Sequence, residues 1–336
     1  YFRFEDYTWD DICHLPGVSR DEIGEWDCIA RKVVEDRFRD ACRNLWPLIE
    51  GLNFRSVSIG IDLLGMEPGA AGYYHNDSIA EKGVYGFYVS AEVFEAYLKS
   101  HFGKNYELSP HKRYMWEHEL IHLCDHKSIT EFRYSSLSTD IREFLIHYLL
   151  SFRNEGIANL YFAMQGHNDV QDPETARQIF LCGIQNFEAA RWEDESIIRQ
   201  KEQEVMTTHD FYSVGPWLIL HALSCADCQI TTPLAGSVAG RIIAGEAVAY
   251  DDIMEVISHA LKITNGDFIR CLTKPGLDDK PFIEGSILCD LSGRIVKINH
   301  KRVIHEEDDE YDRVNAELAD FFNIYCARKS SREKQR

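Results

Sequence analysis

One segment of the sequence, Tyr114 to His126, reads YMWEHELIHLCDH. It contains neither Pro nor Gly, and its apolar positions predict a helix. Residues four apart lie on one face of a helix, so His118 and His122 can present two imidazole rings to one cation. Imidazole suits zinc, and a catalytic zinc ion takes three protein ligands and keeps one position for water. Glu119, beside the first histidine, can accept a proton from that water as it attacks a carbonyl.

A third zinc ligand must come from outside this histidine pair. His126 lies a turn beyond His122 on the same unbroken helix, too far along the axis to complete a tetrahedron readily. Asp140 and His147 are further candidates, but no sequence pattern supports either of them. The strongest candidate is Glu155.

Glu155 begins the motif Glu155-Gly156-Ile157-Ala158, which lies 33 residues after His122. Together with the five-residue segment from His118 to His122, this motif resembles the gluzincin family of zinc peptidases, in which a downstream helix supplies a glutamate as the third ligand. The resemblance implies Zn²⁺ held by the two histidines and Glu155, with the adjacent Glu119 as catalytic base. We expect Gly156 and Ala158 to let the two helices approach closely enough to bring Glu155 to the metal.

The resemblance extends to residues around the metal motif. Asn159, four residues after Glu155, is expected to hold the far ring nitrogen of a zinc-bound histidine, although many gluzincins carry an acid there. The segment Gly86–Ser90, followed by a helix from Ala91, is similar to the edge strand and helix that line the cleft of small gluzincins. A substrate peptide could add to such an edge as an extra strand.

Several gluzincins place a tyrosine before a Gly-led apolar helix. Here Tyr212-Ser213-Val214-Gly215 precedes an apolar helix expected over about 217–225. Tyr212, or His209 nearby, is therefore the expected hydrogen-bond donor to the oxyanion. A tyrosine that only caps or packs at a helix start is the simpler alternative.

The patterning predicts an α+β fold that is predominantly helical, and the resemblance implies a zincin-like catalytic domain with a small sheet flanking its cleft. Alternating residues at 57–61 and a β-branched and aromatic run at 84–89 predict the strands. The longer helices are expected at 91–101, 114–126, 140–165, 173–206 and 247–263. We divide the chain into a helical segment at 1–50, a catalytic domain at 51–270, and a β-hairpin (286–298) with an acidic and basic helical tail at 271–336.

The chain carries 36 Lys and Arg against 55 Asp and Glu, a formal net charge of −19. So negative a surface repels nucleic acid and anionic membranes, and we expect neither as a partner. The ten cysteines are scattered, which favours reduced residues over a disulfide framework. The sequence starts without the features of a signal peptide. We therefore expect a cytoplasmic protein, or one secreted or delivered as an effector without a classical signal peptide.

Cys225 and Cys228 have the spacing of metal ligands, and His221 lies one turn upstream. No second cysteine pair completes four ligands, so we interpret the two as ordinary small residues at a helix end.

These features predict a zinc-dependent peptidase, an endopeptidase acting on peptides or proteins, whose oligomeric state the sequence leaves open. An aminopeptidase is an alternative, and it would need a carboxylate such as Glu67 to pair with a free amino terminus. A non-enzymatic binding protein on a vestigial peptidase fold is another. The presence of Glu119 argues against this last interpretation, because a protein that has lost its enzymatic activity most easily loses the catalytic general base.

Overall fold

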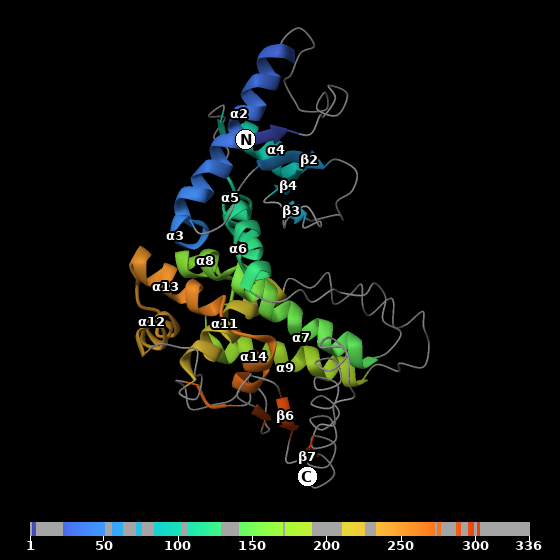
Figure 1. The fold of residues 1–336 in the computed structure, drawn as a ribbon, viewed down its shortest axis with the longest axis vertical. Coiled ribbons are helices and arrows are strands. Elements are labelled where there is room, and N and C mark those ends of the chain that lie inside the picture. The colour runs from blue at the N-terminus through green and yellow to red at the C-terminus, as the bar shows by residue number, and fades with distance from the viewer. Residues whose placement is uncertain are drawn as a thin grey trace. The chain divides into compact units, whose positions relative to one another are not determined.

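The protein is described by a computed structural model in two compact units, residues 1–124 and 125–336. The described residues are 2–4, 23–50, 56–62, 72–75, 84–101, 107–128, 141–170, 172–189, 210–225, 233–272, 274–276, 287–289, 295–298 and 301–302. The boundary between the units falls inside one helix, α6 (Met115–Ser128). The described part of the chain is predominantly helical (Figure 1).

The first unit contains a four-stranded mixed sheet with the order β1-β2-β4-β3. Its strands are β1 (Phe2–Phe4), β2 (Ser56–Asp62), β4 (Val84–Ser90) and β3 (Gly72–His75). β1, β2 and β4 run parallel, whereas β3 pairs antiparallel with β4 and is an edge strand among the strands that the structure describes. Residues 57–61 form a strand, as their alternation predicts, and residues 84–89 form one as their β-branched and aromatic composition predicts.

Two expectations for this sheet were wrong. Gly86–Ser90 was expected at the edge, but β4 lies between β2 and β3, and Phe87 is paired with Ile59 on one side and Tyr74 on the other. The burial of Phe87 and Val89 fits this internal position. The segment 1–50 was expected to be helical, yet Phe2–Phe4 pairs with β2.

Helices α2 (Ile23–Asn44), α3 (Trp46–Ile49), α4 (Ala91–His101) and α5 (Pro110–Arg113) complete the first unit together with most of α6. α4 contacts both α2 and the strands β2 and β4. In the core, the Trp116 ring of α6 lies 5.4 Å from the Phe38 ring of α2 and 6.4 Å from the Phe87 ring of β4, measured between centroids. This aromatic cluster fixes one face of α6 against the sheet and α2.

The second unit is built around α11 (Asp210–Ser224), which packs against several of the described helices. These helices are α7 (Ile141–Ala158), α9 (Pro173–Ala189), α12 (Pro233–Ile243), α13 (Tyr250–Ala260) and α14 (Asn265–Leu272). Between α7 and α9 the chain forms the short helix α8 (Leu160–Phe162) and the π-helix η3 (Ala163–His167). Strands β5 (Ile287–Cys289), β6 (Ile295–Ile298) and β7 (Lys301–Arg302) form a small antiparallel sheet.

Most of the predicted elements are present. The helix expected at 91–101 is confirmed at both ends, and the predicted hairpin is confirmed as the antiparallel pair β5 and β6. The long helix expected at 140–165 is interrupted after Ala158, and α9 is described only to Ala189. None of the described helices combines the length and the apolar composition needed to cross a membrane.

Candidate metal centre

The helix α6 places two imidazole rings side by side. His118 and His122 are each half-buried, and their Nε2 atoms lie 3.0 Å apart. The ring centroids are 4.5 Å apart and the ring planes are nearly perpendicular, at 86°. In this contact one Nε2 donates a hydrogen bond and the other accepts it. Two zinc ligands at tetrahedral positions lie about 3.3 Å apart, so the histidine pair already has almost the spacing that one ion requires.

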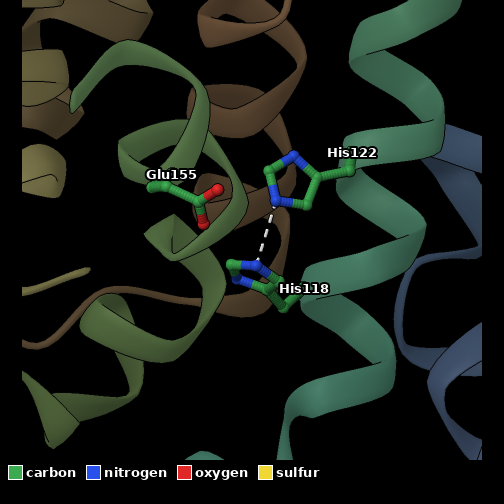
Figure 2. Close-up of side chains that lie close together, drawn as sticks. All are labelled: His118, His122 and Glu155. Carbon is green, nitrogen blue, oxygen red and sulfur yellow. Dashed lines mark hydrogen bonds between the residues drawn. The ribbon is translucent and has the colours of Figure 1, made fainter. Parts of the chain in front are cut away.

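Glu155 of α7 joins this pair. One ligand atom from each of His118, His122 and Glu155 can be chosen so that all three lie within 4.8 Å of one another. Figure 2 shows the Glu155 carboxylate facing the two rings. Two imidazoles and one carboxylate are a known ligand set of catalytic zinc, and they leave a fourth position for water. Among the residues that the structure describes, this is the one such cluster of three His, Cys, Asp or Glu side chains.

Glu155 is positioned by a close crossing of α7 and α11. A Cβ atom built on Gly156 would lie 2.6 Å from the backbone carbonyl carbon and oxygen of Gly215, and one built on Gly215 would lie 2.7 Å from Gly156 Cα. The two helices can therefore touch only because neither residue has a side chain. Gly156 was expected to serve the approach of α7 to the histidine helix. That expectation was wrong about the partner, because Gly156 packs against α11.

A buried ion pair that the sequence did not reveal lies next to two of the candidate ligands. Arg153 of α7 is fully buried and binds the carboxylate of Asp125 on α6 through two hydrogen bonds of 2.8 and 3.0 Å. Arg153 precedes Glu155 by two residues, and Asp125 follows His122 by three. The available signal was a charged residue directly after each of the mainly apolar stretches 120–124 and 149–152, but nothing local shows that the two charges meet.

Glu119, the predicted base, is buried on α6 with 7% of its surface exposed. It directly follows His118 in the chain. Its contact with a metal-bound water stays a prediction.

Asn159 is buried at the end of α7, where its backbone N–H donates to the carbonyl of Glu155 at 2.9 Å. Its carbonyl accepts from the N–H of Ala163 at 2.9 Å, so it joins α7 to the segment that follows. The predicted hydrogen bond from its side chain to a zinc-bound histidine stays a prediction.

Tyr212 lies in the first turn of α11 and is 36% exposed. The apolar helix was expected to start after Gly215, but α11 begins at Asp210 and continues through Pro216. Gly215 is therefore an interior helix residue, selected by its contact with α7. His209, the alternative oxyanion donor, lies outside the described residues.

The face of α6 that packs on α2 carries a buried acid. Glu117 is 4% exposed and accepts a hydrogen bond of 2.8 Å from the side chain of Asn44. Burial raises the pKa of Glu117, which the Asn44 hydrogen bond partly opposes. Burial also raises the pKa of the Cys42 thiol to about 12, and the negative charge of Glu117 adds to that rise. This polar cluster on the first unit holds a thiol that is protonated at neutral pH.

His221, the histidine upstream of the Cys225 and Cys228 pair, has a structural hydrogen-bonding role. Its Nε2 atom lies 3.1 Å from the backbone oxygens of both Cys271 and Lys274, to which it donates. Cys225 is buried and its thiol also donates to the Cys271 carbonyl. Cys228 lies outside the described residues. These contacts attach α11 to the end of α14 and account for His221 without a metal.

Comparisons of the chain with protein-family models, with curated proteins and with solved structures give no match.

Proposed function

We propose that this protein is a zinc-dependent peptidase of the gluzincin type. The observation that carries the proposal is the convergence of His118, His122 and Glu155 within 4.8 Å. A chance pair of histidines on a helix does not account for a carboxylate from another helix facing the same two rings. When bound there, zinc would supply a water of lowered pKa and polarise the carbonyl of the substrate.

Side chains of the protein would carry out proton transfer and stabilise the oxyanion. Glu119 would accept the proton from the water as the new C–O bond forms and the carbonyl becomes a tetrahedral oxyanion. It would then deliver that proton to the nitrogen of the leaving amine as the C–N bond breaks and the carbonyl re-forms. Tyr212, or His209, would donate a hydrogen bond to the carbonyl oxygen as negative charge develops on it. The partial exposure of Tyr212 fits a side chain that meets a substrate.

The proposed fold is zincin-like, with a small sheet flanking the substrate cleft. Two features of the first unit support it: the unit contains both the mixed sheet and the two histidines, and β3 is an antiparallel edge strand. An edge strand leaves backbone N–H and C=O groups for an added strand, so an extended peptide would pair with β3. The inner position of β4 removes the edge first expected at Gly86–Ser90.

Cleavage by the purified protein tests the proposal. Zinc-loaded wild type is incubated with a mixed peptide library, beside Glu119→Gln and the matched control Glu246→Gln, which changes an exposed glutamate of the second unit. We expect wild type and Glu246→Gln to cleave equally, and Glu119→Gln to retain zinc while cleaving about 10² to 10⁴ times more slowly.

Two results would count against the proposal. Undiminished cleavage by Glu119→Gln would exclude this residue as the base. A zinc-loaded wild type that cleaves nothing would reject the peptidase and favour the binding-protein alternative. Peptides with free and acetylated amino termini, compared in the same assay, separate the endopeptidase from the aminopeptidase, because only the latter requires the free amine.

A further inference from the structure

Arg153 has every hydrogen-bond donor of its guanidinium group occupied. The group has five N–H bonds, and all five find an acceptor in the protein. Two bind the Asp125 carboxylate, at 2.8 and 3.0 Å, and one binds the side-chain oxygen of Asn154 at 2.9 Å. The other two, from Nε and Nη2, bind the backbone oxygen of Ile263 at 3.0 and 2.6 Å. The side chain of Arg153 is 0% exposed and that of Asp125 is 8% exposed, so water competes for almost none of these bonds.

These bonds join three separate parts of the chain. Asp125 lies on α6, Arg153 lies on α7, and Ile263 lies in the connection between α13 and α14. The partners of Arg153 are 28 and 110 residues away from it in sequence. A planar guanidinium bound to both carboxylate oxygens fixes the distance and also the relative orientation of the two side chains.

Stability alone is a weak reason for such a pair. The free energy needed to remove two charges from water is about as large as the free energy gained from their attraction. Apolar residues of the same volume often stabilise a helix contact as well or better. An apolar contact, however, allows helices to slide and rotate in a way that a bidentate pair does not. A bidentate ion pair such as that of Asp125 and Arg153 is therefore suited to a site that needs neighbouring side chains to be held at a fixed position.

The neighbouring side chains here are the candidate metal ligands. Asp125 is less than one turn after His122 on the continuous helix α6, and Arg153 is two residues before Glu155 on α7. We infer that Asp125 and Arg153 are positioning residues for the metal centre, which hold α6 and α7 so that the Glu155 carboxylate meets the two imidazoles. This inference rests on the zinc site proposed above. Neither residue belongs to the group of candidate ligands, His118, His122 and Glu155.

Two substitutions change the geometry of the pair without removing its charges. Asp125→Glu lengthens the carboxylate arm by one methylene, and Arg153→Lys replaces the five-donor fork by a point charge with three donors. Arg177→Lys is the matched control, because Arg177 is also a buried arginine on a helix of the second unit, where it pairs with Glu174 of the same helix α9. Folding of each variant is checked by near- and far-UV circular dichroism.

The experiment measures two properties that a purely structural pair would leave unchanged in a folded variant. These are the dissociation constant for zinc, from competition with a chromophoric chelator, and the visible absorption spectrum of the Co²⁺-substituted protein, which reports ligand geometry. We expect Asp125→Glu and Arg153→Lys to bind zinc about 10 to 100 times more weakly than wild type, with an altered Co²⁺ spectrum. Arg177→Lys should match wild type in both.

The outcomes separate this inference from the proposed function. If folded Asp125→Glu and Arg153→Lys bind zinc as wild type does, with the same Co²⁺ spectrum, the positioning role is wrong while the zinc site stands. If wild type binds no zinc, both are wrong. If one of the two variants does not fold, the other decides, since each alters the pair from a different helix.

Discussion

Replacing Gly156 by alanine tests the helix crossing that places Glu155. The new Cβ atom would lie 2.6 Å from the carbonyl carbon and oxygen of Gly215 and 2.9 Å from its Cα. Ordinary contacts between such atoms are about 3.5 to 4.0 Å, so α7 and α11 would have to separate by about 1 Å. The clash involves backbone atoms, which cannot rotate away as a side chain can.

The expected cost follows from two opposing effects. Forcing a methyl group into a packed crossing costs about 1 to 3 kcal/mol, and the higher helix propensity of alanine returns up to about 1 kcal/mol. Gly236→Ala is the matched control, since Gly236 is also inside a helix and, among the described residues, its Cβ would meet only the Leu223 carbonyl oxygen, at 3.4 Å. The control should gain up to about 1 kcal/mol because alanine favours the helix. Glycine-to-alanine substitution is thus expected to lower the free energy of unfolding at position 156 and to raise it at position 236.

Urea unfolding followed by far-UV circular dichroism measures these differences. We expect the unfolding midpoint of Gly156→Ala to fall below that of wild type, and the midpoint of Gly236→Ala to equal or exceed it. Because Gly156 directly follows Glu155, the Gly156→Ala variant should also bind zinc more weakly. A Gly156→Ala protein as stable as wild type, with unchanged zinc affinity, would refute the close crossing and its role in placing the carboxylate.

Two further predictions follow from the pKa shifts. Cys42, whose pKa burial raises to about 12, should react with iodoacetamide at pH 8 far more slowly than the exposed Cys182; equal rates would contradict its burial. A thiol in the unfolded chain ionises near pH 8.5, whereas Cys42 in the folded protein stays protonated until about pH 12. The contribution of Cys42 to the free energy of unfolding should therefore be complete below pH 8.5 and be lost as the pH rises towards 12. The Cys42→Ser variant should not show this loss. Asp172 has a lowered pKa because it accepts hydrogen bonds from the backbone and hydroxyl of Thr175 at the start of α9. The melting temperature of Asp172→Ala should therefore lie below that of wild type at pH 7, and the difference should shrink as the pH falls below about 4; a gap independent of pH would show that the charge contributes nothing.

The sequence predicted those features that depend on residues close together in the chain. The helix carrying His118 and His122 follows from its apolar periodicity and the absence of Pro and Gly, and the helix itself fixes the spacing of the two rings. The helix at Ala91–His101 and the hairpin of β5 and β6 follow for the same reason: their signals lie within the elements or in the turn between them.

The remaining features depend on contacts between distant residues. Whether β4 lies at an edge or inside the sheet is decided by its two neighbours, and a β-branched, aromatic run looks alike in both places. Gly156 was correctly identified as a residue of close approach, but its partner Gly215 is set by the packing of α7 on α11. The pairing of Asp125 with Arg153 was missed because a charge at the end of an apolar stretch does not reveal its partner.

The most direct test of the metal centre is an equilibrium zinc titration of wild type, Glu155→Gln and the control Glu246→Gln against a chromophoric chelator. Glutamine keeps the shape of the side chain and removes the carboxylate charge, so the fold is preserved while the third ligand is lost. We predict one zinc ion per chain for wild type and for Glu246→Gln, and a loss of affinity of at least about 10 to 100 times for Glu155→Gln. A wild type that binds no zinc, or a Glu155→Gln variant that binds it as tightly as wild type, would contradict the site formed by His118, His122 and Glu155.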